Sequence, residues 1–280
     1  MTITFSHTRL ARVAGLLLIL AYPAFVYALP KTLSVPGGVV LIRLGESSTG
    51  SEAPRVWLGD QPVLVATDNG QWTAVVGIAL DTPLGAHELR VKDGAQEKVL
   101  SFEVSAKRYP EQRIRLKDSS KVQLAPDDEA RALGEIAAIQ TLKRHWRDAN
   151  DTETDFTLPV KGRLASRFGL RRVFNGEPRA PHVGLDLAVS RGTPVKAGAP
   201  GLVLAVNEYF FNGKTVFVDH GNGLISMYCH LDRIDVQAGD AVSRGQRVGL
   251  SGMTGRASGP HLHWSVILNG AMVDPELFVD

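Results

Sequence analysis

Short runs of β-branched and apolar residues, separated by turn residues, dominate the hydrophobic pattern of this chain. Between residues 33 and 104 the pattern predicts six strands, at residues 39–43, 54–57, 61–65, 71–77, 87–91 and 99–104. Tight-turn pairs such as Asp93-Gly94 lie between them. Six short strands at this spacing predict a small β-sandwich of immunoglobulin-like type over residues 29–106, here called the β-domain. None of its side chains indicates a catalytic or metal site. We therefore expect the β-domain to act as a binding, spacing or occluding module.

One stretch, residues 129–146, has apolar residues at helical spacing instead. Acidic residues lie near its start and basic residues near its end, which suits the helix dipole. We interpret residues 107–157 as a helical linker between two domains. His145 lies in the basic last turn, where a cation is favourable, and we do not expect it to bind metal.

Strand signals return in residues 158–280, here called the C-terminal domain, together with many more glycines. Strong β patterns occur at residues 201–206, 215–220, 223–230 and 261–267, and residues 220–223 predict a hairpin turn between the second and third. No long helical pattern is visible in this part. We therefore predict a mostly antiparallel sheet here, and a mainly β fold for the whole chain.

The first 28 residues have the pattern of a secretory signal sequence. Arg9 and Arg12 precede an apolar run that ends in Val26-Tyr27-Ala28, a small-residue cleavage pattern. An uncleaved anchor helix is the alternative, which Pro23 and the short apolar run disfavour. No later segment is long and apolar enough to cross a bilayer. We expect an exported protein, located in the periplasm, with no membrane span after cleavage.

Composition narrows the function classes. The 280 residues are 44% hydrophobic and 21% charged, which is ordinary for a globular protein of one or two domains. Removing residues 1–28 takes away two arginines and no acidic residue, leaving 29 basic and 29 acidic residues. A neutral mature chain has no general attraction for nucleic acid, so that partner is excluded. The single cysteine, Cys229, excludes an internal disulfide.

Candidate chemistry begins with His261 and His263, which stand two apart in a predicted strand. Alternate strand residues share a face, so the two imidazoles point the same way while Leu262 and Trp264 point to the other. Taken alone, the pair is equally typical of surface histidines.

Two further motifs give this pair partners. His182 and Asp186 are four apart in His-Val-Gly-Leu-Asp, and His230 ends the segment Tyr-Cys-His. One carboxylate and several imidazoles form a ligand set that suits Zn²⁺. Three protein ligands with a fourth position left to water would make such a site catalytic. The alternative for His182 and Asp186 alone is a capped turn with a surface ion pair.

These motifs, in this order, resemble those of the LytM/lysostaphin-type zinc metallo-endopeptidases of bacterial cell walls. Their signature is a His-x-x-x-Asp segment, a histidine after a Tyr-x pair and a His-x-His strand. The resemblance extends over about residues 158–278, through Ser-Arg-Phe-Gly at 166–169, Gly-Thr-Pro-Val at 192–195, Gly-Met-Thr-Gly at 252–255 and Val-Asp-Pro at 273–275. Many relatives carry glycine where this chain has Cys229, which we interpret as an inert, partly buried thiol. A signal sequence with an N-terminal β-domain is also similar to proteobacterial members.

The resemblance implies a role for each motif residue. His182, Asp186 and His263 would hold one Zn²⁺ per chain, and His230 and His261 would stay unliganded as the catalytic histidines facing the substrate. The reaction would be hydrolysis of peptide bonds in peptidoglycan stem peptides or cross-links. Which histidine is the general base stays open. Two alternatives are a non-catalytic domain that activates a cell-wall amidase and a protease that acts on proteins.

Three residues near these motifs have weaker indications. Asn175 and Arg179 precede His182 and could form a wall of the substrate groove, or could simply be solvated in a loop. His220 is outside the family signature and is predicted to be structural.

Overall fold

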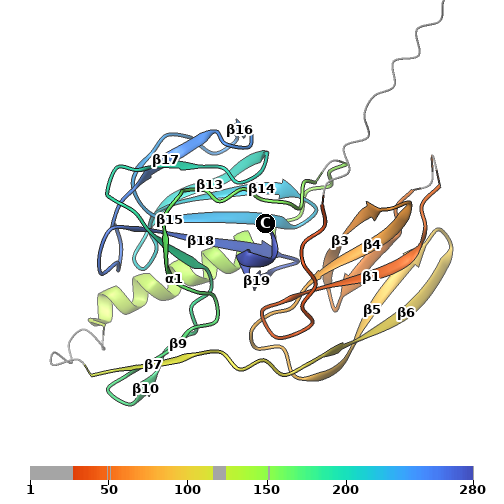
Figure 1. The fold of residues 1–280 in the computed structure, drawn as a ribbon, viewed down its shortest axis with the longest axis horizontal. Coiled ribbons are helices and arrows are strands. Elements are labelled where there is room, and N and C mark those ends of the chain that lie inside the picture. The colour runs from red at the N-terminus through yellow and green to blue at the C-terminus, as the bar shows by residue number, and fades with distance from the viewer. Residues whose placement is uncertain (1–27, 49, 51, 116–123, 151, 280) are drawn as a thin grey trace, which may run out of the picture.

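The computed structural model describes residues 28–279 except 49, 51, 116–123 and 151, so residues 1–27 of the predicted signal sequence lie outside the described part. Two β-rich bodies lie side by side, with one helix against the larger, C-terminal body (Figure 1). Within the described residues, no helix is long and apolar enough to cross a membrane. The mainly β class predicted from the sequence is confirmed.

The β-domain contains all six predicted strands. They are β1 (Val39–Glu46), β2 (Arg55–Leu58), β3 (Gln61–Asp68), β4 (Gln71–Gly77), β5 (Gly85–Asp93) and β6 (Gln96–Val104). Their spatial order is β1-β4-β3-β2-β5-β6, and every neighbouring pair is antiparallel. Strand β3 pairs with β2 through residues 61–63 and with β4 through residues 64–68, so it joins the two halves of the domain. Inward residues such as Val56, Leu89 and Val91 close an apolar core between these halves.

The C-terminal domain is built on one antiparallel sheet in the order β16-β13-β14-β15-β18-β11-β8. Its central strands are β13 (Gly201–Tyr209), β14 (Gly213–Gly221), β15 (Leu224–Ile234), β18 (His261–Leu268) and β11 (Leu185–Ala188). Shorter elements complete it, namely β8 (Arg163–Ser166), β12 (Pro194–Lys196), β16 (Ala241–Val242), β17 (Arg247–Ser251), β19 (Ala271–Val273) and the 3₁₀ helix η2 (Pro275–Leu277). Asn222 and Gly223, with φ of 50° and 73°, form the predicted hairpin turn between β14 and β15.

The two faces of β18 have different surroundings. Leu262, Trp264, Val266 and Leu268 are fully buried in the main core. His261, His263, Ser265 and Ile267 alternate with them and face the other way. The second face carries an apolar patch at one end and histidines at the other.

Helix α1 (Pro126–Lys143) covers the apolar end of that face. Its Ile139 and Leu142 pack against a cluster of Tyr209, Phe217, Ile225, Met227, Cys229 and Ile267. The helix begins three residues before the predicted start because Pro126 suits the first helical turn. It ends three residues earlier than predicted, where the backbone N–H groups of Arg144 and His145 turn to carbonyls three residues back. The histidine end of the face stays open.

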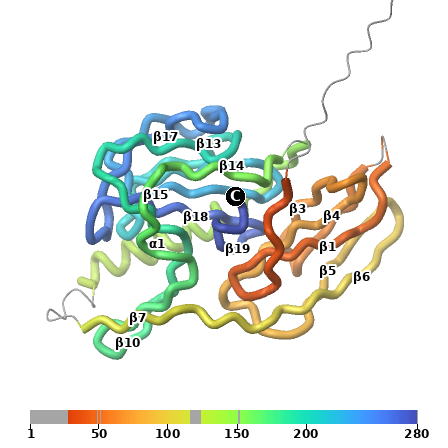
Figure 2. Tube along the Cα trace, viewed as in Figure 1, coloured from red at the N-terminus to blue at the C-terminus, as the bar shows by residue number. Residues whose placement is uncertain are grey.

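The interpretation of residues 107–157 as a helical linker needs correction, because this segment also builds part of the C-terminal domain. Strand β7 (Glu111–Ile114) runs along the lower edge of the view in Figures 1 and 2. It pairs in parallel with β9 (Arg171–Phe174), and β9 in turn pairs antiparallel with β10 (Glu177–Pro178). Phe156 is buried in the main core. Strand β7 has the sequence Glu-Gln-Arg-Ile, in which three of the four residues are polar. The hydrophobic pattern of the chain therefore did not predict this strand.

The β-domain is fixed to the C-terminal domain near β19. The Asn269 side chain accepts from the N–H of Gly77 at 2.6 Å and donates to its carbonyl oxygen at 3.0 Å. A Cβ at Gly77 would lie 2.7 Å from the carbonyl oxygen of Leu268, so only glycine allows this approach. Val39, Leu64 and Val75 of the β-domain belong to the same apolar cluster as Leu268 and Val273. The two domains therefore share a continuous core.

Candidate metal and catalytic site

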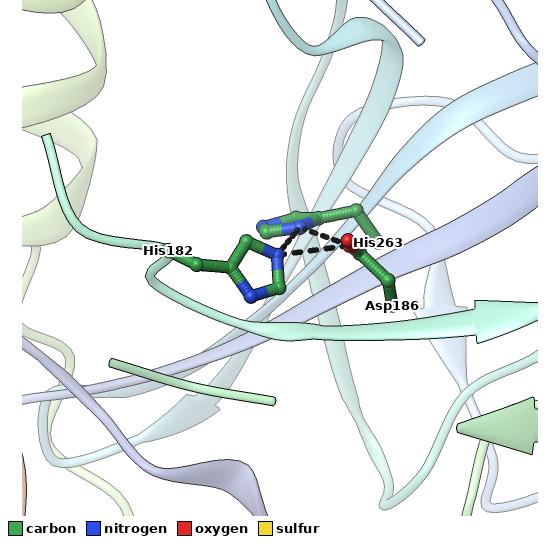
Figure 3. A group of neighbouring side chains, drawn as sticks. All are labelled: His182, Asp186 and His263. Atoms are coloured by element: carbon green, nitrogen blue, oxygen red, sulfur yellow. Dashed lines mark hydrogen bonds and ion pairs between the residues drawn. The ribbon is translucent and has the colours of Figure 1, made fainter. Parts of the chain in front are cut away.

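Three side chains bring one ligand atom each to a single point on the open end of the sheet (Figure 3). Nε2 of His182 lies 2.9 Å from Oδ1 of Asp186 and 3.0 Å from Nδ1 of His263, and the last two atoms are 3.0 Å apart. Asp186 on β11 is the direct cross-strand partner of His263 on β18, while His182 comes from the loop before β11. The sheet register therefore brings together the ligand set that the sequence predicts.

Hydrogen bonds on the far side of each imidazole set its orientation. Nδ1 of His182 donates to the carbonyl oxygen of Arg167 at 2.9 Å, and Nε2 of His263 lies 2.9 Å from the hydroxyl oxygen of Ser265. A carbonyl oxygen only accepts, so neutral His182 carries its hydrogen on Nδ1 and a lone pair on Nε2. When His263 donates to Ser265, Nδ1 of His263 likewise presents a lone pair. With these tautomers all three converging atoms are acceptors, which a cation would satisfy at once. Without a cation, the same two ring nitrogens can instead donate to Oδ1 of Asp186 when they carry a hydrogen.

Burial and charge favour the protonation states that a metal requires. Burial by itself would raise the pKa of the Asp186 carboxyl, but hydrogen bonds and charge interactions with His182 and His263 outweigh it and hold that pKa well below its usual range. Burial lowers the pKa of His263. An ionised Asp186 carboxylate and a neutral His263 imidazole are the forms that bind Zn²⁺. The donor set thus fits a zinc ion in both chemistry and arrangement.

Gly184, between His182 and Asp186, is a residue whose importance sequence reasoning missed. A Cβ there would lie 2.6 Å from Oγ of Ser265 and 2.7 Å from Nε2 of His263. Real side chains do not approach so closely, so a larger residue would displace the His263 ring. The close packing of two strands explains this glycine, and it becomes visible only once their register is known.

His230 and His261 lie beside the ligand set in a different arrangement. Nδ1 of His230 donates to the carbonyl oxygen of Thr254 at 2.9 Å, and Nδ1 of His261 donates to that of Gly259 at 2.8 Å. Their ring centroids are 4.7 Å apart, and Nε2 of His261 is 3.7 Å from Oδ1 of Asp186. In the neutral form, each ring therefore has a lone pair on Nε2, as a proton acceptor requires.

The backbone of His230 adopts an unusual conformation at an irregularity in the β14–β15 pairing, between Tyr228 and Leu231. Its φ is 59°, in the left-handed region, and its N–H donates to the carbonyl oxygen of Asn212 at 2.8 Å. Burial is the main cause that lowers the pKa of His230 to about 4, so this imidazole is neutral near pH 7.

A cavity of about 310 Å³ opens over these histidines. Its lining residues are Arg172, Ala180, Pro181, His182, Val183, Phe211, Asn212, His230, Arg256 and His263. Among the residues that the structure describes, none from the β-domain lines this cavity.

The structure does not place Asn175 or Arg179 in the wall of this cavity, which differs from the sequence expectation. Asn175 forms the β9–β10 turn with φ of 51° and lines another cavity, together with residues 113–115. Arg179 donates to Oε2 of Glu177 at 2.9 Å. Asn175 lies at the turn of this hairpin and Arg179 follows β10 directly, and the hairpin was not predicted. Arg172, Phe211 and Arg256 form the wall instead, and no sequence pattern marked them.

Two known protein-family models match this chain. Residues 180–275 match the model of peptidase family M23, and residues 32–107 match that of the peptidase family M23 N-terminal domain. A crystal structure from Pseudomonas aeruginosa, described as a candidate M23 peptidase, has a TM-score of 0.74 and 42% identity, covering 88% of this chain and 95% of that one. The chain belongs to peptidase family M23. The resemblance predicted from the histidine motifs is confirmed.

Two curated relatives of this M23 chain come from Vibrio cholerae serotype O1. The peptidoglycan DD-endopeptidase ShyA is 44% identical over 120 residues, which cover 42% of this chain and 28% of ShyA. The peptidoglycan DD-endopeptidase ShyC is 39% identical over 115 residues, which cover 40% of this chain and 26% of ShyC. The aligned segment spans about a quarter of each relative.

Other titratable residues of this M23 chain lie apart from the ligand set. His220 is buried, with Nδ1 donating to the carbonyl oxygen of Pro200 at 2.6 Å and Nε2 lying 2.8 Å from Oγ of Ser226. Nε2 of His145 is 3.5 Å from Asp219, near the end of α1. Cys229 is fully buried, and burial raises the pKa of its thiol to about 12, which keeps it unreactive.

Proposed function

We propose that this M23 protein is a zinc-dependent endopeptidase that hydrolyses peptide bonds in the stem peptides or cross-links of peptidoglycan. One observation carries the proposal: three ligand atoms converge beside two histidines that keep Nε2 lone pairs, at one open cavity. The names of ShyA and ShyC support peptidoglycan as the substrate.

Nε2 of His182, Oδ1 of Asp186 and Nδ1 of His263 hold the metal in this proposal. The three atoms already lie within 4.8 Å of one another. A bound Zn²⁺ supplies Lewis acidity and lowers the pKa of a coordinated water toward about 7.

His230 and His261 carry the proton transfers. Each has its Nδ1 hydrogen fixed on a loop carbonyl, so a proton taken from the attacking water is held on Nε2. The imidazolium formed in this way stabilises negative charge on the attacked carbonyl oxygen and then protonates the leaving amine. Two histidines at a ring separation of 4.7 Å can divide these tasks.

The proposed layout follows the chain. A signal sequence at residues 1–28 directs export to the periplasm, the β-domain spans residues 29–106, and residues 158–280 form the peptidase domain. The intervening segment supplies α1, which packs on the peptidase sheet, and β7, which pairs with β9 in a separate three-stranded sheet.

Digestion of purified sacculi, with mass spectrometry of the released fragments, tests the proposal. We expect cleavage at one type of peptide bond, lost with a chelator and in His263→Ala, and retained in the control His145→Ala. A folded, zinc-loaded protein that releases nothing but stimulates a cell-wall amidase would establish the activator alternative instead. Cleavage of general protein substrates but not of sacculi would indicate the protein-directed alternative.

A further inference from the structure

We propose that Glu135, on helix α1, is a positioning residue for the catalytic histidine His230. It acts through residues 210–212, which join β13 to β14 and are here called the cavity turn. Two residues of this turn, Phe211 and Asn212, line the cavity over the histidines, whereas Glu135 is not among the described lining residues. The inference rests on the proposed peptidase function and gives a part in it to the segment between the two domains.

Glu135 lies on the face of α1 that is turned toward the sheet. Ile139 and Leu142 follow it at helical spacing, and both pack on the apolar patch. The Glu135 side chain is 21% exposed, although the larger apolar residues Leu133 and Ile136 are 62% and 45% exposed. An acidic residue therefore occupies an inward position while two apolar residues of the same helix face solvent. Hydrophobic packing does not explain this arrangement, and the partners of the carboxylate do.

Each oxygen of the Glu135 carboxylate has a partner. Oε2 accepts from the backbone N–H of Phe210 at 2.5 Å, and Oε1 accepts from Nε of Arg131 at 2.7 Å. Arg131 also donates to the carbonyl oxygen of Glu208 at 3.4 Å, and its guanidinium carbon lies 5.8 Å from the centre of the Phe210 ring. Hydrogen bonds to a charged acceptor are stronger than those between neutral groups. One turn of α1 therefore holds the end of β13 and the start of the cavity turn.

The cavity turn supports His230 through the backbone. The carbonyl oxygen of Asn212 accepts from the N–H of His230 at 2.8 Å, at the position where the φ of His230 is 59°. A residue other than glycine is less stable in this left-handed conformation than in an extended strand, so surrounding contacts must hold it there. A shift of the cavity turn would therefore move the His230 backbone, and Nε2 of the ring with it.

The cavity turn also contacts the loop that holds the His230 ring. A Cβ at Gly255 would lie 2.3 Å from the nitrogen of Gly213, the residue that follows the turn, so the two backbones touch. The neighbouring Thr254 accepts from Nδ1 of His230 through its carbonyl oxygen. The backbone and the ring of His230 thus depend on segments that meet at the cavity turn, and Glu135 holds that turn from the other side.

Steady-state kinetics on soluble muropeptides test this role. Glu135→Ala removes the acceptor of the Phe210 N–H and should lower kcat by about 10-fold, because proton transfer depends steeply on the position of the acid or base. KM and zinc content should change much less, because Glu135 contacts neither the cavity nor the ligand set. Glu135→Gln keeps an acceptor oxygen for Phe210 and should retain more of the wild-type kcat. Glu129→Ala, which removes an exposed acid from the first turn of the same helix, should match wild type.

Amide hydrogen exchange, followed by NMR, separates this role from the proposed function. In zinc-loaded Glu135→Ala, the His230 amide should exchange about 10-fold or more faster than in wild type, while residues 225–227 of the same strand keep their rates. Faster exchange at His230 in a protein that cuts no peptide bond would support the positioning role and refute only the peptidase function. Unchanged exchange at His230, or a wild-type kcat in Glu135→Ala, would overturn the inference.

Discussion

The ligand set and the open histidines face the same cavity, but the chain holds them in opposite ways. His182 and His263 direct their free nitrogens toward Asp186, and their outer nitrogens are held by the Arg167 carbonyl and Ser265. His230 and His261 are held at Nδ1 by carbonyls of the 252–260 loop, and their Nε2 atoms remain available. His261 and His263 are only two residues apart on β18. Their different roles therefore come from their hydrogen-bond partners and from the carboxylate opposite His263.

Removing an open histidine gives the largest effect that separates the two groups. We expect His230→Ala and His261→Ala each to lower kcat on peptidoglycan fragments by about 10²- to 10⁴-fold, the usual contribution of a positioned acid or base. KM should change much less, because neither residue is proposed to bind the metal. Steady-state kinetics on soluble muropeptides measure both constants. A variant with unchanged kcat would remove that histidine from the mechanism.

His220 lies in the same sheet but is buried away from the site. We expect this histidine to affect the pH dependence of stability and not catalysis. Burial lowers its pKa to about 4, against an ordinary value of about 6.5, so folding favours the neutral ring. As the pH falls, the unfolded chain binds a proton at His220 before the folded chain does. The contribution of neutral His220 to the free energy of unfolding is therefore fully present above about pH 6.5 and is lost as the pH falls toward 4. The loss reaches about 3 kcal/mol at pH 4.

Denaturant unfolding of metal-free protein at pH 7 and pH 4.5 measures this dependence. His220→Gln should be less stable at pH 7, because it alters the hydrogen bonds to Pro200 and Ser226, yet should lose less stability on acidification. An equal loss in wild type and variant would show that His220 does not contribute to acid sensitivity.

Substitution of Ser265 tests the metal-binding group and should have a smaller effect than removal of a catalytic histidine. It is fully buried, and its hydroxyl is the partner of Nε2 of His263. We expect Ser265→Ala to weaken zinc affinity by about 10- to 100-fold, the usual effect of removing an outer partner of a metal-binding histidine. Competition with a chromophoric chelator measures the affinity, with Ser243→Ala, on the turn after β16, as the control. Unchanged affinity would mean that packing alone orients His263.

Much of this molecule was predictable from local patterns. The six strands of the β-domain, the β14–β15 hairpin and the shared face of His261 and His263 all follow from residue alternation and turn chemistry, and the structure agrees. The proximity of Asp186 to His263 was predictable only through the family motifs, because it depends on the register between β11 and β18.

The remaining features depend on contacts between distant segments. The polar strand β7 has no apolar alternation, and its place beside β9 follows from a parallel pairing that no local signal encodes. Helix α1 is visible in the sequence, but its packing on the sheet depends on an apolar patch contributed by four strands. Arg172 and Arg256 both line the cavity, although they lie about 80 residues apart in the sequence. Arginines at or near the surface carry no sequence pattern that distinguishes those lining a cavity from solvated ones.

Zinc content of purified variants tests the central distinction most directly. Elemental analysis should find one zinc ion per chain in wild type, His230→Ala and His261→Ala, and almost none in His182→Ala or His263→Ala, with all five proteins folded by circular dichroism. Retention of stoichiometric zinc in His263→Ala, or its loss in His261→Ala, would contradict the assignment of the two groups.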